Sequence, residues 1–253
     1  MKIAFYGDSL TQAVPGVSYV NLLKAQLPEH TLINYGLAGD TALSLYRRIR
    51  RLKLARPVDL AFLWIGVNDI LVNISPISPI IKRLVGQPWA RSPQEFREQY
   101  RDLLDLLTPC AARLVAVSPL SIGEEPDNHW NRRLAELNDI IAGLVEAYPN
   151  VSYLDMRPAF FAHVGEHPVP AEFFLSRGIH AVVADAIMLV RSEDVDRASR
   201  QRGLHLTLDG VHLNSAGARL VANQMLQVIR AVEAEAPQPL PAPCTGEPAR
   251  QGR

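Results

Sequence analysis

Four short polar motifs in this sequence carry side chains that could together transfer an acyl group. They are Gly7–Leu10 (GDSL), Gly36–Asp40 (GLAGD), Gly66–Asp69 (GVND) and Asp209–His212 (DGVH). A serine hydroxyl becomes a nucleophile when a base takes its proton and a third group holds that base in the right tautomer. Donors must also face the oxyanion that develops on the carbonyl oxygen. The four motifs contain a residue type for each of these tasks.

Within the motifs, Ser9 offers the hydroxyl and His212 can be its base. Asp209 stands three residues before His212, so one turn of chain can bring its carboxylate to the ring Nδ1. Asn68 offers a side-chain N–H, and the backbone N–H groups of Ser9 and Gly39 can complete an oxyanion hole. We therefore predict that Ser9, His212 and Asp209 are catalytic. The predicted oxyanion donors are Ser9, Gly39 and Asn68.

Other acidic and imidazole side chains near these motifs receive different predictions. Asp8 and Asp69 adjoin the motif serine and asparagine, and we expect them to support their loops rather than react. His205 is an alternative base, although it suits a pocket neighbour better. The sequence HVGEH at 163–167 is not the zinc motif HExxH, and the remaining histidines follow no metal-ligand spacing. No metal site is predicted.

The first three motifs each follow a short apolar run that is typical of a β-strand. Because such runs alternate with amphipathic helical segments, the sequence predicts βαβ units and a parallel sheet. Five strands fit the order 2-1-3-4-5, and ligands bind beyond the carboxyl ends of strands in such sheets. The predicted strands are 2–6, 31–35, 60–65, 113–118 and 151–154, and the predicted helices are 19–27, 41–54, 93–107, 128–148 and 215–234.

In their residues and their order the four motifs resemble those of the SGNH hydrolases, also called GDSL esterases and lipases. The matches run from position 7 to position 212. The resemblance implies an α/β fold, a flavodoxin-like three-layer α/β/α sandwich. It also implies a Ser-His-Asp triad, an acyl-enzyme on Ser9, a small-molecule carboxylic ester as substrate, and no metal or organic cofactor. Acetylated carbohydrates, short esters, lysophospholipids and thioesters all remain open as substrates.

Two other functions remain open for the same set of residues. The triad could pass the acyl group to an alcohol instead of water, which would make the protein an acyltransferase. The fold could also persist as an inactive binding module, although no member of the triad is missing. The chain contains no GxSxG, GxGxxG or GxxxxGK[ST] motif, so an α/β-hydrolase elbow, dinucleotide binding and P-loop chemistry have no support.

The motifs lie within one predicted hydrolase domain over residues 1–235. Two segments interrupt the strand–helix alternation, at about 72–91 and 158–207, and each could be a lid, a binding wall or extra core. Within the second, Phe173–Leu175 and 181–190 are apolar. The proline-rich tail, 236–253, is expected to be disordered because it cannot bury enough apolar surface.

The bulk composition excludes some classes of partner. Lys+Arg and Asp+Glu both number 26, so the formal net charge is zero and nothing points to nucleic acid or an anionic membrane. No run approaches the roughly 20 apolar residues of a membrane span. The apolar run after Lys2 is too short for a signal peptide, so a cytoplasmic location is expected. The sequence does not indicate an oligomeric state.

Overall fold

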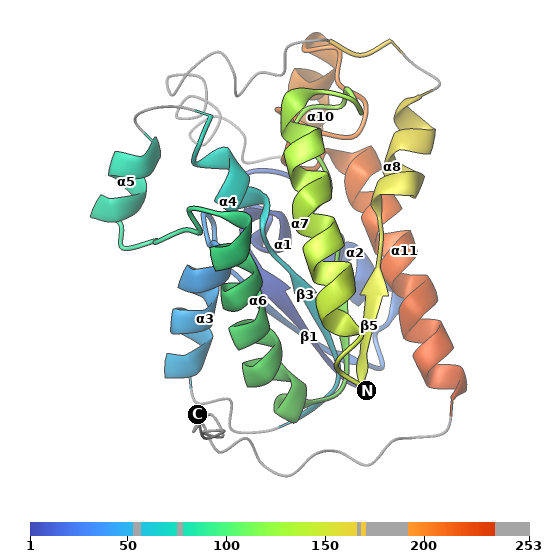
Figure 1. Cartoon of the computed structure of the whole chain (residues 1–253). Helices are drawn as coiled ribbons and strands as arrows, with labels where there is room; N and C mark the ends of the chain where they lie inside the picture. The colour runs from blue at the N-terminus through green and yellow to red at the C-terminus, as the bar shows by residue number, and fades with distance from the viewer. Residues whose placement is uncertain (53–56, 75–77, 166–167, 171–191, 236–253) are drawn as a thin grey trace.

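A computed structural model describes residues 1–52, 57–74, 78–165, 168–170 and 192–235 (Figure 1). Its centre is a five-stranded sheet in the order β2-β1-β3-β4-β5, with every neighbouring pair parallel. The order and direction of the strands confirm the sequence-based prediction. The strands are β1 (Lys2–Gly7), β2 (Thr31–Gly36), β3 (Val58–Trp64), β4 (Ala111–Val117) and β5 (Val151–Leu154).

The central strands are buried because helices cover both faces of the sheet. In β3 every residue except Asp59 is buried, as its continuous apolar run suggested. The rings of Phe5 and Phe62 stack across β1 and β3 with centroids 5.3 Å apart. The sheet therefore gives the loops at its carboxyl edge a rigid base.

Two groups of helices form the outer layers of an α/β/α sandwich (Figure 1). On one face, α2 (Tyr19–Gln26) packs against α11 (Ser215–Ala234). On the other face, α6 (Pro93–Leu107) lies between α3 (Ala42–Arg51) and α7 (His129–Val145) and packs against both.

Three helices begin at residues whose side chains cap them. Ser18 accepts a hydrogen bond from the Asn21 N–H, and Ser92 accepts one from the Glu95 N–H. Asn214 caps α11. Such caps satisfy the N–H groups that the first helical turn leaves without partners.

Helix ends and short helices depart from the prediction. Helix α7 ends at Val145, three residues early, and α3 is helical to Arg51, with residues 53–56 outside the described part. Three short helices near the motifs were not among the predicted elements, since four to seven residues show too little periodicity to identify a helix. These are α1 (Ser9–Gln12), α4 (Val67–Leu71) and α5 (Ser78–Leu84), the last within the insert at 72–91.

The second insert contains α8 (Arg157–Val164) and α10 (Ser192–Gln201). The predictions for Phe173–Leu175, for the run 181–190 and for the tail fall outside the described residues. Among the described helices, none is long and apolar enough to cross a membrane.

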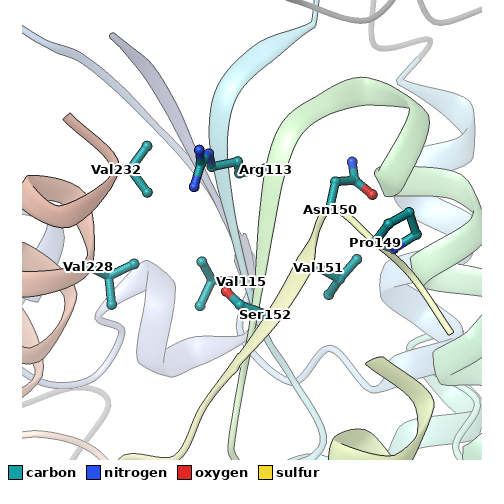
Figure 2. A pocket seen from close by; sticks show the side chains of 8 residues that line it. All are labelled: Arg113, Val115, Pro149, Asn150, Val151, Ser152, Val228 and Val232. Atoms are coloured by element: carbon teal, nitrogen blue, oxygen red, sulfur yellow. The ribbon is translucent and has the colours of Figure 1, made fainter. Parts of the chain in front are cut away.

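A shallow hollow lies at the amino ends of β4 and β5 (Figure 2). Arg113 and Val151 line it from the strands, and Val228 and Val232 line it from the last turns of α11. Since the four motifs lie at the opposite, carboxyl ends of the strands, this hollow is separate from them.

Candidate active site

The turn after β1 places Ser9 at the carboxyl edge of the sheet. Asp8 caps the short helix α1 by accepting a hydrogen bond from the Leu10 N–H at 3.0 Å. Gly7 must be a glycine here, because an added Cβ would lie 2.2 Å from Thr11 Oγ1. Ser9 is the first residue of α1, so its own N–H has no acceptor within the helix.

The structure brings the three predicted catalytic residues into contact. His212 Nε2 lies 2.9 Å from Ser9 Oγ, and His212 Nδ1 lies 2.7 Å from Asp209 Oδ2. All three are buried, and Ser9 and His212 retain 6% and 8% of their surface. Each of these two residues therefore keeps a small exposed area.

The aspartate holds both the backbone and the ring of the histidine. Its Oδ1 accepts hydrogen bonds from the N–H groups of Val211 at 3.0 Å and His212 at 2.8 Å. Burial alone would raise the pKa of Asp209, yet the charge of His212 and these hydrogen bonds hold it below its usual value. An ionised Asp209 can only accept, so the contact keeps the ring proton on Nδ1. His212 Nε2 is then the acceptor facing Ser9.

The predicted oxyanion donors lie on the loops beside Ser9. Asn68 is in the first turn of α4, and its Nδ2 donates to Asp8 Oδ2 at 3.2 Å and to the Asp40 carbonyl at 3.0 Å. Gly39 lies in the turn before α3 with φ +78°, a backbone conformation that favours glycine. Both contacts of the Asn68 amide nitrogen are therefore to groups on the neighbouring loops of the site.

The two predicted supporting aspartates connect the loops of the site. Asp69 accepts hydrogen bonds from the N–H groups of Ala42, at the start of α3, and Ala90, at the end of the first insert, both at 3.0 Å. Asp8 contacts the N–H of Leu10 and the side chain of Asn68. Burial raises the pKa of Asp8 to about 7 and that of Asp69 to about 6.

Glu124 is a buried carboxylate that none of the sequence motifs includes. It is 1% exposed and lies in the loop after β4. It accepts hydrogen bonds from the N–H groups of His205, Leu206 and Thr207 and from the Thr207 hydroxyl, all between 2.7 and 2.8 Å. The same hydroxyl accepts from the Gly210 N–H at 3.1 Å. Glu124 thus fixes the segment that leads into the Asp209–His212 motif. Glu124 is 81 positions before His205 and belongs to no motif, so the sequence alone does not indicate this contact.

The alternative base, His205, lies in the same loop but faces another group. Its Nε2 lies 3.0 Å from the Pro168 carbonyl oxygen, and its backbone N–H donates to Glu124. His212 is the histidine in contact with Ser9.

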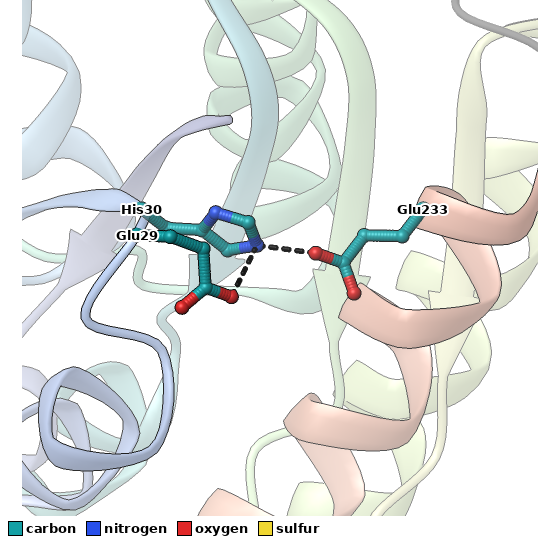
Figure 3. Close-up of side chains that lie close together, drawn as sticks. All are labelled: Glu29, His30 and Glu233. Carbon is teal, nitrogen blue, oxygen red and sulfur yellow. Dashed lines mark hydrogen bonds and ion pairs between the residues drawn. The ribbon is translucent and has the colours of Figure 1, made fainter.

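One imidazole lies between two carboxylates at the opposite end of the molecule (Figure 3). His30 Nε2 bonds to Glu233 near the end of α11 and lies 3.7 Å from Glu29. His30 Nδ1 lies 3.2 Å from the amine of Met1. Both ring nitrogens of His30 therefore have partners within the protein. Through its contact with Glu233, His30 connects the loop before β2 to α11.

Solved structures similar to this chain include several esterases. An acetyl xylan esterase, AlAXEase, is 23% identical with a TM-score of 0.61, covering 90% of this chain and all of that one. A catalytic mutant of Axe2, an acetylxylan esterase from Geobacillus stearothermophilus, is 18% identical with a TM-score of 0.62, covering 90% and 93%. A lipolytic G-D-S-L family protein from Veillonella parvula is 16% identical with a TM-score of 0.59, covering 91% and 98%.

These likenesses agree on the fold of the chain. No curated protein matches it in sequence. The model of the GDSL-like lipase/acylhydrolase family matches residues 5–220, which include all four motifs. This chain therefore belongs to the GDSL-like lipase/acylhydrolase family and is an enzyme of the esterase and lipase class.

Proposed function

We propose that this enzyme hydrolyses carboxylic esters through an acyl-enzyme on Ser9. The observation that carries the proposal is the chain of contacts from Ser9 Oγ through the His212 ring to Asp209, at 2.9 and 2.7 Å. The three groups lie in the order that nucleophile, base and orienting carboxylate require. The catalytic domain would span residues 1–235.

In the first half of the reaction, Ser9 Oγ attacks the ester carbonyl carbon and its proton passes to His212 Nε2. Negative charge builds on the carbonyl oxygen, where the N–H groups of Ser9, Gly39 and Asn68 would stabilise it. The carbon–alkoxy bond then breaks, and His212 returns the proton to the leaving alcohol. The imidazolium is stabilised throughout by Asp209.

In the second half, water attacks the acyl carbon while His212 Nε2 takes one of its protons. The bond to Ser9 Oγ breaks, the acid leaves, and the proton returns to the serine. Every proton in this cycle moves among Ser9, His212, the alcohol and water. The proposed mechanism therefore draws on no metal or organic cofactor.

An acetyl ester is the substrate to test first. Two of the similar structures are acetylxylan esterases, and this is the reason to include acetylated xylo-oligosaccharides. A series of p-nitrophenyl esters from two to sixteen carbons would measure how long an acyl chain the site accepts. Added alcohols in the same assay would reveal any acyl transfer.

The test compares wild type with Ser9→Ala and with Ser92→Ala, a matched control at an exposed cap of α6. We expect Ser9→Ala to lose nearly all turnover and Ser92→Ala to retain it. A fluorophosphonate probe should label the wild type at Ser9, located by mass spectrometry. Full turnover by folded Ser9→Ala protein would overturn the proposal.

A further inference from the structure

The first insert is fastened directly to the loop that carries Gly39. Gln87 Nε2 donates to the Ala38 carbonyl at 2.9 Å, and Lys82 Nζ, from α5, donates to the Gly39 carbonyl. Lys82 Nζ also contacts Gln87 Oε1 at 3.3 Å. The two side chains thus act as a linked pair on consecutive carbonyl groups.

The first of these carbonyls belongs to the same peptide unit as the Gly39 N–H. Because a peptide unit is planar, a donor that fixes the Ala38 carbonyl also fixes the direction of the Gly39 N–H. A hydrogen bond to the carbonyl also polarises the unit and strengthens its N–H as a donor. On the other side of the loop, the Ala38 N–H donates to Gln12 Oε1 at 2.7 Å. The loop is therefore held from both sides.

The packing at this point is close. A Cβ added to Gly39 would lie 2.6 Å from Gln87 Oε1. Neighbouring contacts also join the insert to this loop, since Thr41 Oγ1 donates to the Pro88 carbonyl and the Ala90 N–H donates to Asp69. Gln87 is therefore pressed against the peptide it contacts.

Lys82 also places a positive charge beside a group of buried carboxylates. Burial lowers the pKa of Lys82, while the charges of Asp69, Asp8 and Asp40 raise it. Of these carboxylates, Asp8 contacts the Asn68 amide that is proposed to hold the oxyanion, and the ionised form of Asp8 would oppose the charge on that oxygen. A cation in contact with the Gly39 carbonyl offsets that repulsion.

We propose that Gln87 and Lys82 are positioning residues that hold the Gly39 N–H toward the oxyanion. These two residues of the first insert then support the oxyanion hole from outside the four motifs. The inference rests on the proposed function, because it assumes that the Gly39 N–H contacts the reacting ester.

The sharpest variant is Gln87→Glu. Glutamate keeps an oxygen for Lys82, but its other oxygen cannot donate to the Ala38 carbonyl. We expect kcat for p-nitrophenyl acetate to fall about tenfold or more, less than the roughly 10²–10³ of a deleted donor, with KM within about twofold. Gln26→Glu, at an exposed position on α2, is the matched control and should leave both constants unchanged. Lys82→Met provides a second variant with the same expectation.

The affinity for an alkylboronic acid distinguishes an effect on the oxyanion hole from a purely structural effect, which would leave that affinity unchanged. It forms a tetrahedral adduct with a serine hydroxyl, and one oxygen of the adduct takes the place of the oxyanion. Its affinity should fall by the same factor as kcat in Gln87→Glu and in Lys82→Met. Unchanged kcat and boronate affinity in folded variants, or a change in KM alone, would overturn the inference. Failure of the proposed function would instead appear as retained turnover in Ser9→Ala.

Discussion

Replacing Asp209 by asparagine isolates the role of its charge and its acceptor oxygen. The amide oxygen of the Asp209→Asn side chain can still accept from the Val211 and His212 N–H groups, as Asp209 Oδ1 does. The amide NH₂ group would then face His212 Nδ1, where the carboxylate accepts at 2.7 Å. The proton would move to Nε2, and Nε2 would no longer be an acceptor for the Ser9 hydroxyl.

The size of the effect follows from the buried contact. Two unit charges about 4 Å apart at an effective dielectric constant of about 20 interact by about 4 kcal/mol. Losing that stabilisation of the imidazolium alone would slow the reaction about 10³-fold, since each 1.36 kcal/mol is tenfold. The unfavourable tautomer adds to this loss, so we expect kcat to fall by about 10³–10⁴.

The assay is steady-state hydrolysis of p-nitrophenyl acetate, with folding checked by circular dichroism. Asp209→Ala is the comparison variant, because it also removes the acceptor of two buried N–H groups. It should destabilise the protein more than Asp209→Asn does, at a similar loss of kcat. A folded Asp209→Asn protein with kcat within about tenfold of wild type would refute the reasoning.

Three further predictions concern the neighbours of the triad. Asn68→Ala should lower kcat by about 10²–10³, the usual size for one oxyanion donor, and a loss of only a few-fold would remove Asn68 from the hole. Glu124→Gln should cost about 1–3 kcal/mol of unfolding free energy, because its NH₂ group would meet N–H donors. Urea denaturation measures that loss, and unchanged stability would contradict the contact. Burial raises the pKa of Asp8 to about 7 in the folded protein. As the pH rises from about 4 to 7, the unfolded chain therefore loses this proton before the folded protein does. Over that range the unfolding free energy of the wild type should fall, relative to that of Asp8→Asn, by up to about 1.4 kcal/mol per pH unit. Urea denaturation at several pH values tests this, and a difference that does not vary with pH would count against it.

The direction of the strands could be predicted from the sequence, because the alternation of apolar runs and amphipathic segments is local and indicates a parallel sheet. The strand order was predicted by analogy with flavodoxin-like sheets, since the alternation alone does not determine it. The strand ends then place Ser9 and Asn68 at one edge without any knowledge of packing. The DxxH spacing likewise predicted the contact of Asp209 with His212, because three residues close a single turn of chain.

The groups that hold this arrangement in place became visible only in the folded molecule. Glu124 contacts residues more than 80 positions away, and Gln87 contacts Ala38 across 49 positions. Neither contact leaves a periodicity or a local motif, because a single side chain can meet any loop that the fold brings near. The sequence could not choose between His205 and His212 by proximity to Ser9, since that contact spans 203 positions and depends on the path of the whole chain. Local spacing thus specified the chemical groups, whereas long-range packing specified what holds them in place.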